Sequence, residues 1–159
     1  MTKLSMFERD TVALTDGVWV NPDPKNLDME LLVKARDASF LDALSVAYRE
    51  LVRKAREDGR LKSRQGISDL PPSTVQIAED ELILTRLVLG VRNLEGEHGP
   101  VSIKEYREMA LTERFRPLLD LAREAVAIAT DRRAADREEA LGNFGNSRPI
   151  NSGGAAPQE

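Results

Sequence analysis

The chain has 159 residues, a length that fits one domain with one hydrophobic core. Its formal net charge of −4 gives no overall positive field to attract nucleic acid, and the absence of cysteine excludes disulfides and thiolate chemistry. Charged residues make up 31% of the chain and aromatic residues 4%, which favours helices with solvated faces over a β-sandwich. Without a signal pattern in residues 1–20 or a membrane-length apolar run, we expect a soluble cytoplasmic protein.

Two short strands are predicted near the N-terminus, in "GVWVNP" and "MELLVKAR". The connector "NPDPKNLD" between them is rich in turn-forming residues, so an antiparallel pair is expected. Val18 and Val20 would share one face of this pair, and Trp19, the only tryptophan, would lie on the other. A register slip of one residue exchanges the faces, so the sequence leaves open which face is exposed.

The first long helix is predicted from an N-cap at Ser39 to a stop at Gly59. It has an apolar stripe at steps of three and four residues, made of Leu41, Leu44, Tyr48, Leu51 and Ala55. The loop that follows closes at the Pro71-Pro72 pair, because proline cannot continue a helix.

A second helix is predicted over residues 74–91, introduced by a capping box of Ser73 and Gln76. Apolar residues cover most of its circumference, so we expect it to be central and buried. Ser102 and Glu105 form a second capping-box pattern, which predicts a short helix over "IKEYREMAL".

The last helix is predicted over residues 112–140. Proline is tolerated only in a first turn, so Pro117 indicates either a bend or a true start at Arg116 or Pro117. The segment 143–159 has no periodicity and is rich in Gly, Ser, Pro and Ala, which is typical of disorder.

These elements predict a mostly α fold: a small helical domain of about four helices with an N-terminal two-stranded β-hairpin and a disordered C-terminal tail. The predicted boundaries are 1–37 for the N-terminal segment with its hairpin packed on the helices, 38–142 for the helical body and 143–159 for the tail.

We predict no catalytic, cofactor or metal site, and so no enzyme. The single histidine, His98, lies in "EGEHGP" without further ligands or a nucleophile at workable spacing, so we interpret it as an exposed loop residue. "NPDPKNLD" lacks the glycine and the closing glutamate of a calcium loop, and the chain has no glycine-rich phosphate loop.

One basic stretch ends the first long helix and enters the following loop; it comprises Arg53, Lys54, Arg56, Arg60, Lys62 and Arg64. It could hold phosphates, but no aromatic residues are interleaved for base stacking, and cations at a helix C-terminus also offset the helix dipole. Trp19 suits an interface because it joins a large apolar area to a polar N–H, although packing on its own fold is the alternative.

The order of these features resembles the tail assembly chaperones of long-tailed bacteriophages. The likeness rests on the strands "DGVWV" and "LLVKAR", on "VRNLEGEHGPVSIKEYREMAL" and on the charged final helix, and it covers roughly Phe7 to Phe144. Leu94 to Tyr106 is similar to the stretch in which a buried helix of that family runs into a glycine-bounded turn and a Ser-led short helix.

The resemblance implies a non-enzymatic role. The protein would bind the tape-measure protein in the host cytoplasm, keep it soluble, help to recruit tail-tube subunits and be absent from the finished virion. Partner-binding candidates are Trp19, the basic group Arg53, Arg56 and Arg60, and Phe115 as an exposed anchor. Self-association stays open.

Two alternatives come from other classes of protein. A structural head-tail connector or tail-completion protein of the phage particle is also compatible with a helical chain. A small nucleic-acid-binding regulator would use the basic stretch, in spite of the net negative charge.

Overall fold

The computed structural model describes residues 16–145, with side chains up to residue 142. Its elements in chain order are β1 (Val18–Val20), β2 (Glu30–Val33), α2 (Ala38–Glu57), the 3-10 turn η2 (Ile67–Asp69), α3 (Pro72–Arg86), β3 (Val88–Arg92), β4 (Glu95–Gly96), β5 (Gly99–Pro100), α4 (Ile103–Ala110), the 3-10 turn η3 (Glu113–Phe115) and α5 (Arg116–Gly145). Four α-helices and the N-terminal strand pair within residues 16–145 confirm the predicted mostly helical class. The predicted tail lies outside the described residues beyond the end of α5, and so do residues 1–15.

The strand pair β1–β2 is antiparallel, as predicted, with Trp19 opposite Leu32 and Val20 opposite Leu31. Val20 and Leu31 are 1% and 0% exposed, whereas Trp19 is 38% exposed. The valines therefore face the core and Trp19 lies on the outer face of the sheet, which answers the question that the sequence left open.

A third strand corrects the predicted second helix. The helix ends at Arg86, and Val88–Arg92 becomes β3, which pairs antiparallel with β2 and leaves Leu89 as a bulge between the partners of Leu32 and Val33. A short run such as "LVLGV" is apolar on every side, so its periodicity does not distinguish strand from helix. Hydrogen bonding to β2 favours a strand over a helix at residues 88–92, because an unpaired β2 edge would leave buried backbone groups without partners.

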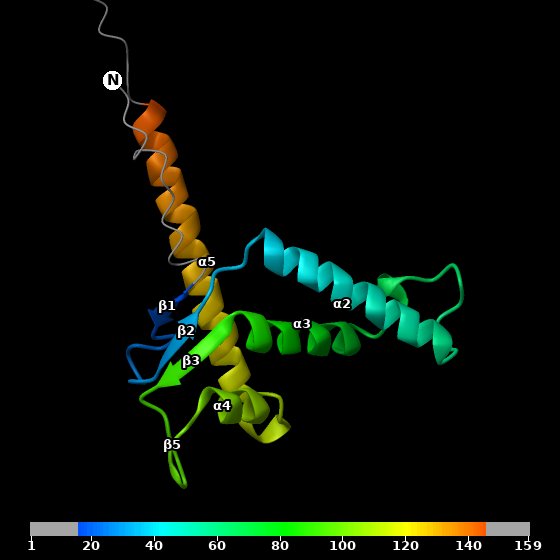
Figure 1. Cartoon of the computed structure of the whole chain (residues 1–159), viewed down its shortest axis with the longest axis horizontal. Helices are drawn as coiled ribbons and strands as arrows, with labels where there is room; N and C mark the ends of the chain where they lie inside the picture. Colours follow the sequence, from blue (N-terminus) through cyan, green and yellow to red (C-terminus); the bar gives the residue numbers. More distant parts are fainter. Residues whose placement is uncertain (1–15, 146–159) are drawn as a thin grey trace, which may run out of the picture.

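The core lies between the sheet and the helices α3, α4 and α5. Helix α5 packs on β1 and β2, and α4 packs on β3 and α5 (Figure 1). Tyr106 of α4 is completely buried, and its hydroxyl donates a hydrogen bond of 2.6 Å to the carbonyl of Leu118. The predicted capping box of α4 is confirmed: the backbone N–H of Ser102 donates to the Glu105 carboxylate, and that of Glu105 donates to the Ser102 hydroxyl.

The helices α2 and α3 extend together away from the sheet and are joined through η2 at the far end; we call residues 38–86 the arm (Figure 1). The arm has its own small apolar cluster, whose buried members are Ala55, Leu61 and Leu70. This cluster is separate from the main core, so the far half of the arm is supported by only a few buried side chains.

The helix ends of the arm differ from two predictions. The N-cap of α2 is Asp37 rather than Ser39, because the Asp37 carboxylate accepts from the backbone N–H of Phe40 at 2.8 Å. The Ser73-led capping box was also wrong: α3 begins at Pro72, whose ring suits the first helical position. The predicted stop at Gly59 is confirmed by its left-handed φ of +73°.

Helix α5 starts at Arg116, as Pro117 indicated, and continues well beyond the body of the fold (Figure 1). Its apolar residues contact the core as far as Ala129, and the side chains from 131 to 142 are almost all exposed. Within residues 16–145, no helix combines the length and the apolar character needed to cross a bilayer.

Candidate partner-binding surfaces

Trp19 lies across the outer face of the sheet, where its neighbours come from all three strands. The indole has room because Gly90 of β3 has no side chain there: an added Cβ would lie 3.4 Å from the indole ring. The Arg92 guanidinium stacks over the indole at 4.3 Å from its centroid and also pairs with Glu30 on β2. The hydrogen bond from Arg92 lowers the pKa of the Glu30 carboxyl. Trp19 is thus fixed in place by its own sheet while part of the ring faces solvent.

The predicted basic group lies at the far end of the arm, where each arginine has a partner. Arg53 pairs with Glu50 and Glu57 on its own helix, and these carboxylates raise its pKa. Arg56 donates to the backbone carbonyl of Gln65 at 2.8 Å. Arg60 pairs with Asp58 at 3.0 Å. The group therefore helps to hold α2 and the loop that follows it in their observed conformation.

The third predicted candidate, Phe115, lies in η3 just before α5 and is 36% exposed. The Arg114 guanidinium covers its ring at 5.1 Å from the centroid. Trp19, the basic group and Phe115 lie on three different parts of the molecule: the sheet, the tip of the arm and the start of α5 (Figure 1). The structure does not bring the predicted residues together into one surface.

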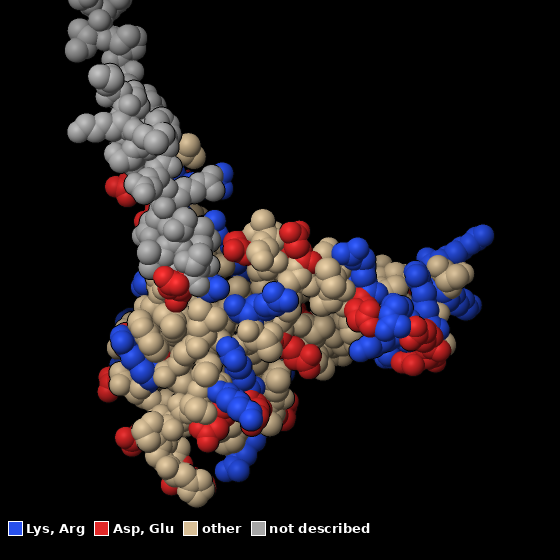
Figure 2. Space-filling model, in the orientation of Figure 1, with Lys and Arg blue, Asp and Glu red and all other residues tan. Residues whose placement is uncertain are grey.

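Charge is distributed unevenly over the chain. Between Arg49 and Arg64 there are seven basic side chains against three acidic ones, although the whole protein carries a net charge of −4. Figure 2 shows basic side chains gathered at the end of the arm, interleaved with a few acidic ones. The tip of the arm is thus locally positive in an acidic protein.

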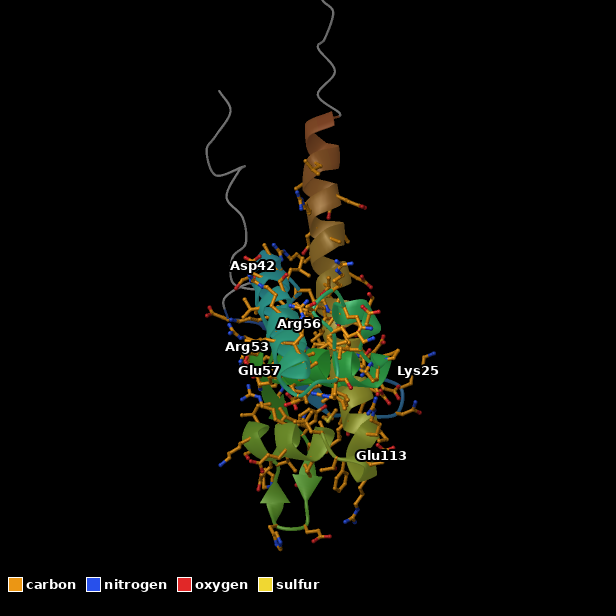
Figure 3. All side chains as sticks on the ribbon, turned by 90° about the vertical axis from the view of Figure 1, so that its right-hand side faces the viewer. Lys25, Asp42, Arg53, Arg56, Glu57 and Glu113 are labelled. Carbon is orange, nitrogen blue, oxygen red and sulfur yellow. The ribbon has the colours of Figure 1, made fainter. Side chains whose placement is uncertain are left out.

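An open groove of about 700 Å³ runs along α2 toward η2. Its lining residues are Ser45, Tyr48, Arg49, Val52, Arg53, Arg56, Glu57 and Ile67. The side chains of Arg53, Arg56 and Glu57 project from this part of α2 in Figure 3. The floor of the groove is mainly apolar and its margin is charged, which is the usual composition of a protein-binding surface.

The groove exists because α2 carries two apolar stripes side by side where the sequence analysis assigned one. Buried or half-buried residues that point toward the core or the arm cluster are Phe40, Leu44, Leu51, Val52 and Ala55, and of these Val52 also lines the groove. Leu41, which was predicted to belong to the same inward stripe, is 57% exposed. Leu41, Tyr48 and Val52 lie at i, i+7 and i+11, so they form a second stripe on one side of the helix. We call these three residues the open stripe.

Tyr48, Val52 and Ile67 were not among the binding candidates predicted from the sequence. Their spacing was visible in the sequence, but a wide apolar face is normally assigned to the core as a whole. Burial raises the pKa of the Tyr48 hydroxyl, with a further contribution from the nearby Glu79 carboxylate on α3. Tyr48 therefore lies between the side of α2 that packs on α3 and the side that faces the open groove.

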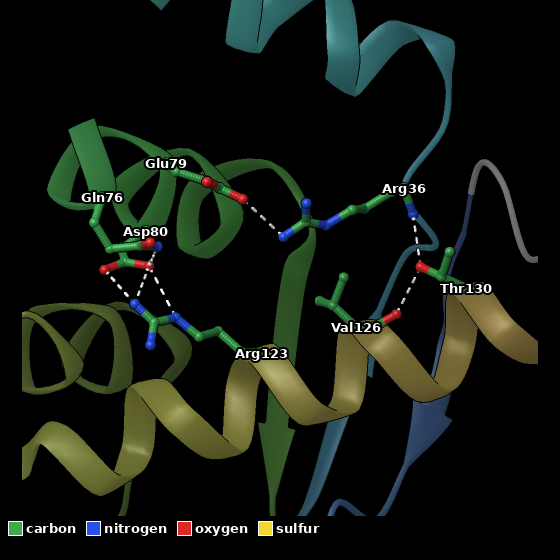
Figure 4. A network of polar contacts seen from close by, with 7 residues as sticks. All are labelled: Arg36, Gln76, Glu79, Asp80, Arg123, Val126 and Thr130. Atoms are coloured by element: carbon green, nitrogen blue, oxygen red, sulfur yellow. Dashed lines mark hydrogen bonds and ion pairs between the residues drawn. The ribbon is translucent and has the colours of Figure 1, made fainter. Parts of the chain in front are cut away.

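A buried ion pair joins the arm to α5 (Figure 4). Asp80 of α3 is 2% exposed, and its carboxylate accepts hydrogen bonds of 2.6 to 2.9 Å from the Arg123 guanidinium. Gln76 donates a further hydrogen bond of 3.0 Å to Asp80. These contacts satisfy the carboxylate completely, so this cluster is a structural joint between two elements.

The remaining polar candidates have ordinary structural surroundings. His98 lies exposed in the hairpin β4–β5, as expected. The connector between β1 and β2 is a turn closed by the Asn21 amide, which donates to the carbonyl of Leu27 at 2.7 Å. In the part of the chain that the structure describes, no three His, Asp or Glu side chains are grouped closely enough to hold a metal ion.

The features of the arm are the most specific ones for a functional proposal: an open stripe, a groove at its end and a positive tip. The groove is open along a helix and has no enclosed cavity. No family model, no curated protein and no solved structure matches this chain.

Proposed function

We propose that the protein is a non-enzymatic tail assembly chaperone of a long-tailed bacteriophage. It binds the tape-measure protein, keeps it soluble and helps to recruit tail-tube subunits during tail assembly. The sequence resemblance supplies the family. The structural observation that supports it is the open stripe of Leu41, Tyr48 and Val52 on an arm that projects from the fold.

The physical reason for such a role lies in the partner. A tape-measure protein is a long helix with exposed apolar stripes, and such surfaces aggregate unless they are covered. An amphipathic helix with an accessible apolar side is a natural cover, and many copies are needed along a long partner. In this proposal the protein acts in the host cytoplasm and is absent from the finished virion.

The test is co-expression of the tagged protein with the tape-measure protein of the same genome, followed by affinity purification and a count of the bound copies. We expect soluble co-purification with several copies per partner. A tape-measure protein that stays insoluble while the tagged chain elutes alone would refute the proposal. Recovery of the chain in purified virions would favour a head-tail connector or tail-completion protein instead.

Two substitutions on α2 make a matched pair for this experiment. Leu41 and Val46 are 57% and 56% exposed, but only Leu41 lies on the open stripe. Leu41→Asp is expected to reduce the yield of soluble tape-measure protein several-fold, because it places a charge among the contacting apolar groups. Val46→Asp should leave the yield unchanged; an equal loss from both variants would show that the effect is not specific to the stripe.

The positive tip of the arm supports a second candidate, a regulator that binds nucleic acid. Binding of this kind would weaken steeply with salt, because it releases counterions from the phosphate backbone. A gel-shift experiment with DNA and RNA at low salt tests this candidate. A shift that moderate salt abolishes would support nucleic-acid binding, and the absence of a shift would eliminate it.

A further inference from the structure

The open stripe has a charged margin on one side only. On a helix, residues three or four positions apart are neighbours, so Arg49 lies next to Val52, and Arg56 continues the same side beyond Val52. Both arginines line the groove together with Tyr48 and Ile67, and the Arg53–Glu57 ion pair also lies on its margin. An occupant of the groove would therefore contact apolar groups along its centre and guanidinium groups along its edge.

Two of the arginines in this margin have no carboxylate partner among the described side chains. Arg53 is neutralised by Glu50 and Glu57. Arg49 makes only a contact of 3.5 Å with the Ser45 carbonyl, and Arg56 donates to the Gln65 carbonyl. Arg49 and Arg56 therefore keep their full positive charge at the edge of the groove, where a carboxylate from a partner could pair with them.

The length of the open stripe fits a short helix. Leu41 and Val52 are eleven residues apart, which corresponds to about 16 Å along α2, or three helical turns. Ile67 of η2 closes the end of the groove nearest to the tip. A partner helix of about three turns that runs along α2 would cover the stripe by ordinary packing of apolar ridges and grooves.

We infer that this surface binds an acidic amphipathic helix: a helical segment of a partner protein with apolar residues at i, i+4 and i+7 and Asp or Glu beside them. The inference rests on the proposed function, because it assumes that the tape-measure protein contains such helical segments. It goes further by stating which segments are bound and which groups select them, namely Arg49 and Arg56. Electrostatic complementarity of this kind sets specificity and association rate more than total affinity.

The structure disfavours two other occupants. The projecting part of α5 of a second copy has Leu141 as the one large apolar side chain described between 131 and 142, which is too few for a stripe of three positions. A single-stranded nucleic acid is normally bound by several aromatic rings on which its bases stack, and the groove contains one, the half-buried Tyr48.

The probe is a pair of synthetic 18-residue helical peptides with identical apolar positions, one flanked by Glu and the other by Lys. Binding to the full chain is measured by fluorescence anisotropy at low and moderate salt. We expect the Glu peptide to bind at least tenfold more tightly than the Lys peptide, with a preference that shrinks as salt rises. Equal binding of both peptides, or of neither, would overturn the inference.

Charge reversal in the protein makes the test specific to the groove. The double variant Arg49→Glu with Arg56→Glu is expected to reverse the preference toward the Lys peptide, and Val52→Asp should abolish binding of both. Reversal at Lys25, an exposed residue in the connector between β1 and β2, is the matched control and should change nothing. Circular dichroism of each variant verifies the fold. A short DNA duplex that displaces the Glu peptide would assign the surface to nucleic acid and overturn the inference.

The two proposals can fail separately. If the tape-measure protein co-purifies equally well with the wild type, with the double Arg variant and with Val52→Asp, then the proposed function stands and the inference about the groove is wrong. If the peptides behave as expected but the tape-measure protein does not co-purify, then the groove is correctly described and the partner is a different protein.

Discussion

Asp80 is a buried carboxylate that depends on neighbouring side chains to compensate its charge. The Arg123 guanidinium and the Gln76 amide supply all of its partners, and Arg123 itself is 29% exposed at its side chain. Removal of Arg123 would leave a buried carboxylate uncompensated, whereas removal of the Asp80 charge would leave a guanidinium that can still reach water. The two partners should therefore differ in how much their loss costs.

We expect Arg123→Met to lower the free energy of unfolding by about 3 kcal/mol. Asp80→Asn keeps a hydrogen-bond acceptor and should cost about 1 kcal/mol. Urea unfolding followed by circular dichroism measures both, with Arg137→Met on the exposed part of α5 as a control without effect. Equal costs for the two partners would contradict the asymmetry.

Trp19 provides its own probe, because it is the only tryptophan in the chain. Gly90→Val would place side-chain atoms where the indole now lies, since even a Cβ would be 3.4 Å from the ring. We expect the indole to be displaced into solvent and its fluorescence maximum to move to longer wavelength. Thr85→Val, at an exposed position on α3, should leave the spectrum unchanged. An unchanged spectrum in Gly90→Val would mean that Trp19 does not pack on β3.

Among the elements, the junction between α3 and β3 is the one whose position could not be predicted from the sequence. The two N-terminal strands, the start of α5 and the capping box of α4 were predictable, because each has a local signal: alternation, a proline, or the Ser-x-x-Glu spacing. The change from helix to strand at Leu87 has no such signal. It is fixed by partners distant in the chain: β2 beside it, and Arg107 of α4, whose guanidinium donates to the carbonyls of Leu84 and Val88 at 2.8 and 2.6 Å.

Arg107 should therefore be important for this junction. Arg107→Ala removes two charge-assisted hydrogen bonds from half-buried carbonyls and is expected to lower the free energy of unfolding by about 2 kcal/mol. Thermal unfolding of the variant, with the exposed Lys104→Ala as a comparison on the same helix, measures the effect. Indistinguishable melting temperatures would show that the backbone pairing alone holds the junction.

The capping box of α4 gives a prediction about pH. The backbone N–H of Ser102 lowers the pKa of the Glu105 carboxyl below its ordinary value of 4.5. The stabilisation is therefore fully present above that ordinary value and is lost as the pH falls through the lower pKa of the folded protein. Glu105→Gln cannot titrate, so its unfolding midpoint should fall less than that of the wild type between pH 5 and pH 3. Parallel curves for the two proteins would contradict this assignment.

Over the whole molecule, stability should be uneven. The sheet and the first half of α5 surround the main core, the tip of the arm has three buried apolar residues, and α5 beyond residue 130 is almost entirely exposed. Hydrogen exchange measured by mass spectrometry should therefore be fastest at 131–142, intermediate at 50–70 and slowest at 30–33 and 118–129. Binding of the acidic peptide should slow exchange in α2 and η2, which line the groove. Uniform exchange over the chain would show a single cooperative unit instead.

At this scale the sequence predicted the class of the molecule better than its surfaces. Trp19, Arg53 and Phe115 were selected for their residue types, and the structure places them apart, with partners on their own elements. The open stripe was missed because a sequence shows that an apolar face is wide but not how much of it a neighbouring helix covers. That fraction depends on the angle at which α3 lies against α2, which is a property of the folded chain.

Arg36, in the linker before α2, contacts two other elements at the root of the arm. Its guanidinium pairs with Glu79 of α3 at 3.0 Å, and its backbone N–H donates to the Thr130 hydroxyl of α5 at 3.1 Å (Figure 4). One linker residue thus contacts both α3 and α5, the two helices that the buried Asp80–Arg123 pair also joins. A substitution at Arg36 therefore removes the pair with Glu79 but keeps the backbone hydrogen bond to Thr130, so the linker would stay attached to α5 while α3 loses one of its contacts with the root of the arm.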